Sequence, residues 1–427
     1  MQAGWKASVL ALLLAGCGLP YTPPALAPVT TPAPPAVATA SVERRAPVTI
    51  LVSIDGLRPD QLGRGDTPNI DALARGGVSA AMRPSFPTLT FPNHYTLVTG
   101  LVPDHHGLID NTMEDPSRPG VRFLNSDPTA NRDAFWWNGA EPIWVAAERA
   151  GIRTATMFWP GTEAAIRGVR PSDWQAYDAD VTGTQRTDTM LDWMRRPAAN
   201  RPAFATLYFD TVDKASHHIG FAAPEVAAAL REIDRNIGVL RDGLAAMGQA
   251  ANLVIVSDHG MAPIPPEHQM PTTALLDPAD SRALFSGPML GIFPLPGHEA
   301  AVTKRVLAYH THGRCWRRQD IPARLRFGTN PRVPPLVCLS DLGWRFAQDQ
   351  VSNYVRGDHG FDNAEPAMHA VFVANGPAFV PGRTLPVFDN VDVYPLLRTL
   401  IGLPPATNID GTAAPFSRVL TKTPGAR

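Results

Sequence analysis

The tripeptide Asp-His-Gly occurs twice in this chain, at residues 258–260 and at residues 358–360. Each copy places a carboxylate and an imidazole beside a glycine that lets the backbone turn tightly, and divalent metal ions accept both side chains as ligands. A third acidic turn, Asp55-Gly56, and an Asp/His cluster in residues 210–218 offer more ligands of the same types. The sequence therefore indicates a metal site assembled from distant segments.

The Asp/His cluster contains two possible pairs of ligands. Asp213 and His217 are four residues apart, so on a helix they would face the same ion. Asp210 and His218 are near alternatives, but the i, i+4 spacing of Asp213 with His217 suits shared binding better than the i, i+5 spacing of Asp213 with His218. We therefore favour Asp213 and His217.

A hydroxyl nucleophile belongs where a helix amino terminus can help to bind an anion. Thr90 precedes Phe91-Pro92-Asn93 and the helix-like run NHYTLVTG, so we expect Thr90 at the N-cap with its hydroxyl in the anion site. Thr88 and Ser85 lie in the same segment and compete on composition alone. Together with two metal ions about 4 Å apart, such a hydroxyl could hydrolyse a phosphate ester.

Buried strands that alternate with helices must position these groups. Runs rich in β-branched and apolar residues predict strands at VTILVSI, AFATLYF, ANLVIVS and HAVFVAN. Helical periodicity is found in NIDALARGG, EPIWVAAERA, QRTDTMLDWMRR, PEVAAALREIDRNIGVLRDGLAAMG and VDVYPLLRTLIG. This alternation is typical of an α/β fold with a mostly parallel sheet, whose sites form at the carboxyl ends of strands. The residues that fall there are Asp55, Asp210, Asp258 and His259.

The stretch at about residues 285–345 interrupts this rhythm with prolines and short strand-like pieces such as ARLRF and PPLVCLS. We expect a small inserted subdomain beside the site. Cys315 and Cys338 both lie in it, and a disulfide between them would close a loop of roughly two dozen residues.

The amino terminus carries export signals. Residues 1–17 contain Lys6, an apolar run too short to span a bilayer, and the segment Leu14-Ala15-Gly16-Cys17, which looks like a lipobox. An ordinary signal peptide cleaved near Ala25 or Ala27 is the alternative. Residues 18–46 are rich in Pro and Ala and read as a tether, so the catalytic domain is expected at 47–427. We expect a lipoprotein of the bacterial periplasm or cell envelope, held to the membrane only through a lipid on Cys17.

The charge of the chain argues against a polyanionic partner. The formal net charge is −1 and charged residues make up 18%, so no basic field favours a nucleic-acid duplex or an anionic membrane. A phosphate-bearing small molecule would have to be met locally, and no obligate protein partner is implied.

Several long and specific segments lie between approximately Val48 and Leu403, and they read LVSIDGLRPDQL, TPNIDALARGGV, PTLTFPNHYTLVTGLVPDHHGLIDNTM, IWVAAERAGIRTATMFWPGTE, NLVIVSDHGM and GDHGFDNAEPAMHAVFVANGPAF. These segments resemble the nucleotide pyrophosphatase/phosphodiesterase family of the alkaline phosphatase superfamily. The resemblance implies an alkaline-phosphatase-like α/β/α sandwich. It also implies a covalent phosphothreonine intermediate on Thr90, with Asn111 donating to a phosphoryl oxygen.

By the same resemblance the chain would hold two Zn²⁺ per subunit. One ion would be bound by Asp55, Thr90, Asp258 and His259, and the other by Asp213, His217 and His359. Asp358 has no ligand role in the family pattern and is expected to orient His359 or to cap a turn.

The resemblance further implies a nucleotide-type substrate whose base lies between Phe91 and Tyr177, although Trp174 could replace the tyrosine. The expected activity is therefore that of a two-zinc phosphodiesterase or nucleotide pyrophosphatase. A phosphomonoesterase, or a diesterase acting on phospholipid or choline-phosphate esters, is the alternative within the superfamily. A surface lipoprotein that binds ligands without turnover is the alternative from another class.

Overall fold

The computed structural model describes residues 45–347 and 355–421. The predicted signal peptide, Cys17 and almost all of the predicted tether lie outside these residues. No helix within the described ranges is both long enough and apolar enough to cross a membrane.

A nine-stranded sheet forms the centre of the fold, in the order β18-β2-β17-β8-β1-β7-β5-β6, with β19 also pairing with β2. Its strands are β1 (Val48–Ile54), β2 (Val78–Arg83), β5 (Thr154–Met157), β6 (Asp173–Gln175), β7 (Phe204–Phe209), β8 (Ala251–Val256), β17 (Ala370–Asn375), β18 (Arg383–Thr384) and β19 (Phe388–Asp389). Strand β1 is parallel to both of its neighbours, β7 and β8. Strand β17 runs antiparallel to β8 and to β2, so the expected mostly parallel sheet is confirmed with one reversed strand.

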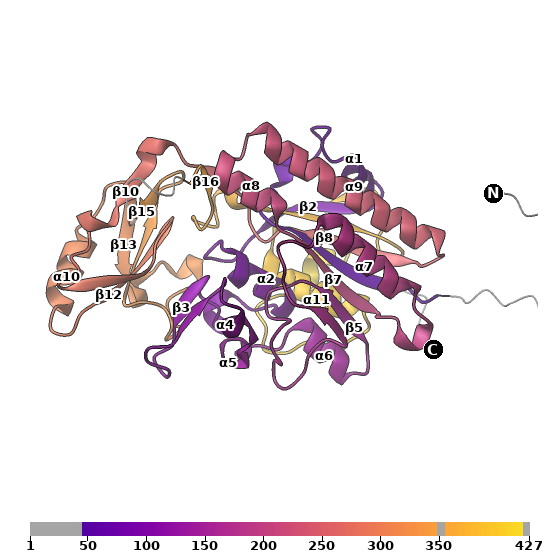
Figure 1. Ribbon diagram of the computed structural model, residues 1–427, viewed down its shortest axis with the longest axis horizontal. Coiled ribbons are helices and arrows are strands. Elements are labelled where there is room, and N and C mark those ends of the chain that lie inside the picture. The colour runs from indigo at the N-terminus through magenta and orange to yellow at the C-terminus, as the bar shows by residue number, and fades with distance from the viewer. Residues whose placement is uncertain (1–44, 348–354, 422–427) are drawn as a thin grey trace, which may run out of the picture. The chain divides into compact units, whose positions relative to one another are not determined.

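Helices cover both faces of this sheet, which confirms the α/β/α sandwich (Figure 1). One layer contains α1 (Pro68–Arg75), α7 (Gly183–Arg195), α8 (Thr211–Ile219) and α9 (Pro224–Ala246). The other contains α2 (Thr90–Thr99), α6 (Ile143–Arg149) and α11 (Val393–Leu400). Every residue of β1 is buried, with Ile50 and Val52 packed in the first layer's core and Leu51 in the second's. A strand buried on both faces must be apolar throughout, which explains the continuous run VTILVSI.

The remaining elements lie in shorter segments around the sandwich. They are the hairpin of β3 (Thr112–Glu114) and β4 (Arg122–Leu124), the pairs β9 (Ala262–Pro263) with β16 (Gly357–Asp358) and β10 (Gln269–Pro271) with β15 (Arg345–Ala347), and the short helices α3 (Pro103–His106), α4 (Pro128–Arg132) and α5 (Ala134–Trp137).

The segment that was expected to be an insertion contains a four-stranded antiparallel sheet in the order β11-β12-β14-β13, with α10 (Glu299–Leu307). Its strands are β11 (Ser281–Phe285), β12 (Met289–Pro294), β13 (Gly313–Arg317) and β14 (Leu336–Ser340). The predicted disulfide is confirmed, because Cys315 and Cys338 are directly opposite on β13 and β14 and are bonded. The strand-like run ARLRF was misread: residues 323–325 form a 3₁₀ turn that ends at Arg326, whose φ is 49°.

Candidate active site

Acidic and imidazole side chains converge at the carboxyl edge of the central strands. Asp55 follows β1, Asp258 is the second residue after the end of β8, and Asp213 lies on α8, which begins after β7. Three groups have ligand atoms within 4.8 Å of one another: Asp55, Asp258 and His259; Asp213, His259 and His359; His217, Asp358 and His359. Because His259 and His359 each belong to two groups, the ligands form one continuous cluster.

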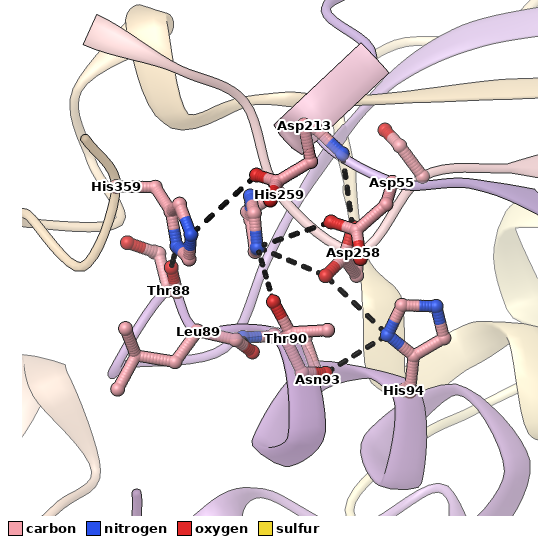
Figure 2. A network of polar contacts seen from close by, with 12 residues as sticks. Asp55, Thr88, Leu89, Thr90, Asn93, His94, Asp213, Asp258, His259 and His359 are labelled. Atoms are coloured by element: carbon pink, nitrogen blue, oxygen red, sulfur yellow. Dashed lines mark hydrogen bonds and ion pairs between the residues drawn. The ribbon is translucent and has the colours of Figure 1, made fainter. Parts of the chain in front are cut away.

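The first half of the cluster surrounds the Nε2 atom of His259. This atom lies 2.9 Å from Oδ2 of Asp258 and 3.6 Å from Oδ1 of Asp55. It also lies 3.2 Å from the hydroxyl oxygen of Thr90, at the start of α2 (Figure 2). Segments that are far apart in the chain therefore bring the predicted nucleophile and three predicted ligands together.

The second half contains the other three predicted ligands. Nε2 of His217 lies 3.4 Å from Oδ2 of Asp213, one helical turn away on α8. Nε2 of His359 lies 3.1 Å from Nε2 of His217 and 3.6 Å from Oδ1 of Asp213. The rings of His359 and His259 are stacked with centroids 3.5 Å apart, which joins the two halves.

The alternative pair in the Asp/His segment has other surroundings. The carboxylate of Asp210 accepts hydrogen bonds from Arg186 at 2.8 Å and from Tyr177 at 2.5 Å. His218 is exposed to solvent on α8. The structure therefore brings Asp213 and His217 into the cluster and leaves Asp210 and His218 outside it.

The donor set suits divalent cations. Buried carboxylate oxygens of Asp55, Asp213 and Asp258 have no hydrogen-bond partner among the described residues. Burial and the neighbouring carboxylates of Asp258 and Asp213 raise the pKa of Asp55 well above its usual value. Unpaired anionic oxygens in such a buried place would be costly on their own, and a bound cation would compensate them.

Each imidazole ring of the cluster is oriented by a contact of its Nδ1 atom. The Nδ1 atoms of His217, His259 and His359 lie 2.8 to 2.9 Å from the backbone carbonyl oxygens of Gly357, Gly260 and Thr88, respectively. A ring that donates from Nδ1 to a carbonyl presents an unprotonated Nε2, which is the form that binds a metal. All three Nε2 atoms face the cluster.

The carboxylate of Asp358 contacts the backbone of its neighbour and an arginine. Its Oδ1 accepts a 3.0 Å hydrogen bond from the backbone N–H of His359, and its Oδ2 forms a 3.0 Å ion pair with Nε of Arg345. Asp358 is close enough to be grouped with His217 and His359, and its Oδ2, paired with Arg345, has no hydrogen-bond partner among the described residues.

The position of Thr90 corrects one expectation. The N-cap of α2 is Leu89, with φ −119° and ψ 155°, and Thr90 is the first helical residue. The N-cap side chain makes no hydrogen bond, and the Thr90 hydroxyl points to His259 instead of capping the helix. The hydroxyls of the two other candidate nucleophiles are hydrogen-bonded elsewhere: Thr88 donates to the carbonyl oxygen of Phe361 and Ser85 donates to Asn390.

Asn111 lies beside the same helix start. Its Oδ1 accepts a 3.0 Å hydrogen bond from the backbone N–H of Phe91, so its Nδ2 is the group left to donate to a ligand. The preceding residue, Asp110, is buried, and burial raises the pKa of its carboxyl to about 8. Asp110 accepts from the backbone N–H of Thr112 at 2.9 Å and thereby shapes the turn that carries Asn111.

A pocket of about 330 Å³ opens beside Thr90. Phe91 and Tyr177 both line it, as the sequence predicted, together with Phe158, Trp159 and Tyr208. Tyr177 is 44% exposed, so it is available to a ligand and is not a core residue. The alternative aromatic, Trp174, lies on the edge strand β6 with the guanidinium of Arg170 5.3 Å from its ring centroid.

Three residues of the site were not predicted. Tyr208 donates to Asp55, His94 lies 3.3 Å from Asp258 through Nδ1, and Lys214 contacts both Asp210 and Tyr177 in the pocket wall. Each is a sequence neighbour of a predicted residue: Tyr208 is two residues before Asp210, His94 is one turn after Thr90, and Lys214 follows Asp213. Proximity to those residues was the available signal.

Comparisons with known proteins agree on one family. A family model described as type I phosphodiesterase / nucleotide pyrophosphatase matches residues 49–362. An uncharacterised pyrophosphatase/phosphodiesterase of Schizosaccharomyces pombe is 34% identical over 391 residues, covering 84% of this chain and 78% of that protein. The bis(5'-adenosyl)-triphosphatase enpp4 of Xenopus laevis is 33% identical over 368 residues, with the same coverage of 84% and 78%. Ectonucleotide pyrophosphatase/phosphodiesterase family member 1 of Rattus norvegicus is 35% identical over 382 residues, but the chain spans only 42% of that protein.

Solved structures give the same result. Human ectonucleotide pyrophosphatase/phosphodiesterase 5 superposes with a TM-score of 0.84 at 30% identity, covering 88% of this chain and all of that one. An inactive variant of the murine protein, with a threonine replaced by alanine and in complex with AMP, has a TM-score of 0.83 at 29% identity and the same coverage.

Proposed function

Because this chain belongs to the type I phosphodiesterase / nucleotide pyrophosphatase family, we propose that it hydrolyses phosphodiester or phosphoanhydride bonds of nucleotide-type substrates with Thr90 as the nucleophile. Enzymes of this family are hydrolases that act on phosphodiester bonds. The observation that carries the residue assignment is the position of the Thr90 hydroxyl, 3.2 Å from His259, within the ligand cluster and at the edge of the pocket.

The family is metal-dependent, and we infer that this chain holds two Zn²⁺ per subunit. Asp55, Thr90, Asp258 and His259 would hold one ion, and Asp213, His217 and His359 the other. Mixed carboxylate and imidazole sets suit zinc, although they also accept manganese or iron. When bound, such ions neutralise charge on the phosphoryl oxygens and lower the pKa of a coordinated hydroxyl.

In the first step the Thr90 oxygen attacks phosphorus, and the bond from phosphorus to the leaving oxygen breaks. The product of this step is a phosphothreonine ester, and the leaving group departs with its electron pair and then takes a proton. The start of α2 directs its amide dipoles toward the phosphoryl group, and Nδ2 of Asn111 donates to one of its oxygens. A donor placed where charge develops contributes about 3 kcal/mol in comparable sites.

In the second step a water molecule attacks the phosphothreonine, and the bond from phosphorus to the Thr90 oxygen breaks. The phosphate monoester is released, and the Thr90 hydroxyl is restored. Nδ1 of His94 lies 2.9 Å from the carbonyl oxygen of Thr90 and 3.3 Å from Oδ2 of Asp258, and its Nε2 lies 2.8 Å from the Ser53 hydroxyl. These contacts keep the ligands in place during turnover.

The pocket supports a nucleotide-type substrate. A base placed between Phe91 and Tyr177 would meet aromatic surfaces that accept any base, at about 1–3 kcal/mol per stacked base. Two relatives point in the same direction: one is named a bis(5'-adenosyl)-triphosphatase, and another was solved in complex with AMP.

Two other substrate classes remain the rivals within the superfamily. A phosphomonoester carries an extra negative charge, so its site would need a positive group. The nearby cation Lys214 is already bound to Asp210 at 2.5 Å and to the Tyr177 hydroxyl at 2.8 Å, which disfavours this class. A choline-phosphate or phospholipid ester would use the aromatic pocket for its headgroup. Ligand binding without turnover is the rival from another class.

We also propose that the protein is a lipoprotein of the bacterial periplasm or cell envelope, anchored through Cys17. The disulfide between Cys315 and Cys338 supports this, because disulfides persist in oxidising compartments. Labelled palmitate should enter the wild-type protein but not Cys17→Ser. Equal labelling of the two proteins would remove the anchor proposal.

The catalytic proposal is tested with purified protein and bis-p-nitrophenyl phosphate, with and without a chelator. We expect metal-dependent turnover that is lost in Thr90→Ala and kept in Thr88→Ser, which retains the hydroxyl bonded to Phe361. Absence of metal-dependent turnover in the wild-type protein would contradict the catalytic proposal. A p-nitrophenyl nucleotide ester, p-nitrophenyl phosphate and p-nitrophenylphosphocholine, compared side by side, separate the three substrate classes.

A further inference from the structure

The loop that leads into Thr90 lacks regular structure of its own. Residues 84–89 belong to neither a helix nor a strand, and all of them except Leu89 are buried. The helix that follows is not capped by the Leu89 side chain. The polar backbone groups of a buried irregular loop need partners from elsewhere, and those partners decide where the loop rests.

The side chain of Asn93, one turn into α2, supplies most of these partners. Its Nδ2 donates to the carbonyl oxygens of Pro87 and Leu89, at 2.8 and 3.0 Å. Its Oδ1 accepts from the backbone N–H of Ser85 at 2.9 Å. The Asn93 amide therefore bridges both ends of the loop. Because the Ser85 N–H needs an acceptor, the amide atom that faces it is the oxygen.

A second buried amide completes this arrangement from the far end of the chain. Asn390, which is fully buried, donates from Nδ2 to Oδ1 of Asn93 at 2.8 Å. Its own Oδ1 accepts from the Ser85 hydroxyl at 2.8 Å. Asn93 thus uses both donors and both acceptor sites of its amide, and Ser85, Asn93 and Asn390 close a ring. Asn390 lies beyond residues 49–362, the part matched by the family model.

We propose that Asn390 is a positioning residue for the Thr90 nucleophile and acts through Asn93. Without Asn390, the Oδ1 of Asn93 keeps one donor and the Ser85 hydroxyl loses its acceptor in a buried place, so the loop can settle differently. A nucleophile displaced by about 1 Å can lose roughly 100-fold in rate. The inference rests on the proposed role of Thr90.

The test compares Asn390→Ala with Asn252→Ala. Asn252 is a matched control: it is buried, and its amide oxygen accepts from the backbone N–H of Ala378 at 3.0 Å. It lies near the start of β8, at the opposite end of that strand from Asp258. Both variants lose a buried amide, but only one of them touches the nucleophile loop.

With bis-p-nitrophenyl phosphate and rates corrected for folded protein, we expect kcat/KM to fall about 10- to 100-fold in Asn390→Ala. The inhibition constant of AMP and the metal content should stay within about twofold of the wild type, because ground-state binding does not require exact placement of the attacking oxygen. Asn252→Ala should lower the Tm and leave kcat/KM within about twofold. The proposal is overturned if kcat/KM in Asn390→Ala stays within twofold of the wild type. It is also overturned if Asn252→Ala loses as much kcat/KM as Asn390→Ala at a similar loss of Tm.

Hydrogen exchange gives a readout that does not depend on turnover. The amides of the peptide covering residues 84–93 should exchange faster in Asn390→Ala and not in Asn252→Ala, because the Ser85 N–H is bonded within the ring. If the wild-type protein shows no metal-dependent turnover, the proposed function fails and exchange alone decides on Asn390. Unchanged exchange in this peptide would show that Asn390 does not order the loop.

Discussion

The hydroxyl oxygen of Tyr208 lies 2.5 Å from Oδ2 of Asp55, the carboxylate that follows the central strand β1. Among the residues that the structure describes, the other oxygen of Asp55 has no hydrogen-bond partner, and it faces the cluster near His259. One carboxylate oxygen is thus held by the protein while its partner is presented to a ligand. This arrangement is typical of residues that support a metal ligand from behind.

Tyr208→Phe should therefore weaken metal binding. The change removes the hydroxyl and keeps the ring that packs edge-on against His94, with centroids 5.0 Å apart. We expect the dissociation constant for zinc to rise about 10- to 100-fold, measured by recovery of activity in metal buffers. Tyr394→Phe is the control, since that tyrosine is also buried and its hydroxyl donates to the carbonyl oxygen of Glu141. Equal affinities in the two variants would contradict the prediction.

Tyr177→Ala should discriminate between substrates. If a base stacks on this ring, kcat/KM for thymidine 5'-monophosphate p-nitrophenyl ester should fall about 10- to 100-fold, as expected for a lost stacking interaction of about 1–3 kcal/mol. Methyl p-nitrophenyl phosphate, which has no base, should change by less than about threefold. Trp174→Ala is the matched control on strand β6. A selective loss in Trp174→Ala instead would transfer the role to that residue.

The hydroxyl of Tyr177 should matter less than its ring. It donates to Asp210 and accepts from Lys214, and Asp210 is paired with Arg186 as well. Although burial opposes it, hydrogen bonds from Lys214 and Tyr177 lower the pKa of Asp210, so this carboxylate remains charged. Tyr177→Phe removes both hydrogen bonds and should raise KM for the nucleotide ester by a few-fold with kcat unchanged. A loss as large as that of Tyr177→Ala would show that the ring alone does not bind the base.

Asp110→Asn should change how stability depends on pH. Burial raises the pKa of Asp110 to about 8, so its stabilising contribution is complete below the unfolded pKa near 4 and is lost as pH rises to 8. Relative to the wild type, the variant should gain unfolding free energy across this window by up to about 1.4 kcal/mol per pH unit. Urea unfolding at several pH values measures the difference. Asn retains the acceptor for the Thr112 N–H.

Asp392→Asn is the control for that experiment. The pKa of Asp392 is raised by burial to about 6, and this carboxylate also accepts from a backbone N–H, that of Thr412. Its difference from the wild type should therefore level off near pH 6, two units earlier. Identical pH profiles for the two variants would mean that neither carboxyl is responsible.

Removal of metal should destabilise the wild-type protein but not Asp55→Asn. Burial and the carboxylates of Asp258 and Asp213 oppose ionisation of Asp55, so without a cation this residue works against folding. We expect a chelator to lower the Tm of the wild type and zinc to restore it. The metal-free Asp55→Asn protein should melt a few degrees above the metal-free wild type and gain little from zinc. A Tm of the metal-free variant below that of the metal-free wild type would contradict the prediction.

Much of this site could be predicted because its residues follow apolar strands. Asp55 and Asp258 come directly after runs that only a buried strand explains, and parallel strand ends meet at one edge. The spacing of Asp213 and His217 predicted their shared helical face. The wrong N-cap at Thr90 has a tertiary cause: the Thr90 hydroxyl points to His259, 3.2 Å away and distant in the chain, and Leu89 is the N-cap residue.

Other features depend on long-range contacts that no local pattern encodes. Strand β17 reads as one more buried strand, and its reversal relative to β8 follows only from how the chain returns to the sheet. The hydrogen bond between Asn390 and Asn93 joins residues almost 300 positions apart, and a single asparagine before a helix usually caps a turn. Such pairings appear only when the tertiary structure is known.

The ligands come from five segments between Asp55 and His359, and no two neighbouring strands contain a complete set. A chain that has formed only part of its sheet therefore has no site to fill. During refolding, catalytic activity should return after most secondary structure has formed, because these contacts join segments that are far apart in the chain. The rate at which activity recovers would thus report the rate of the last step of folding.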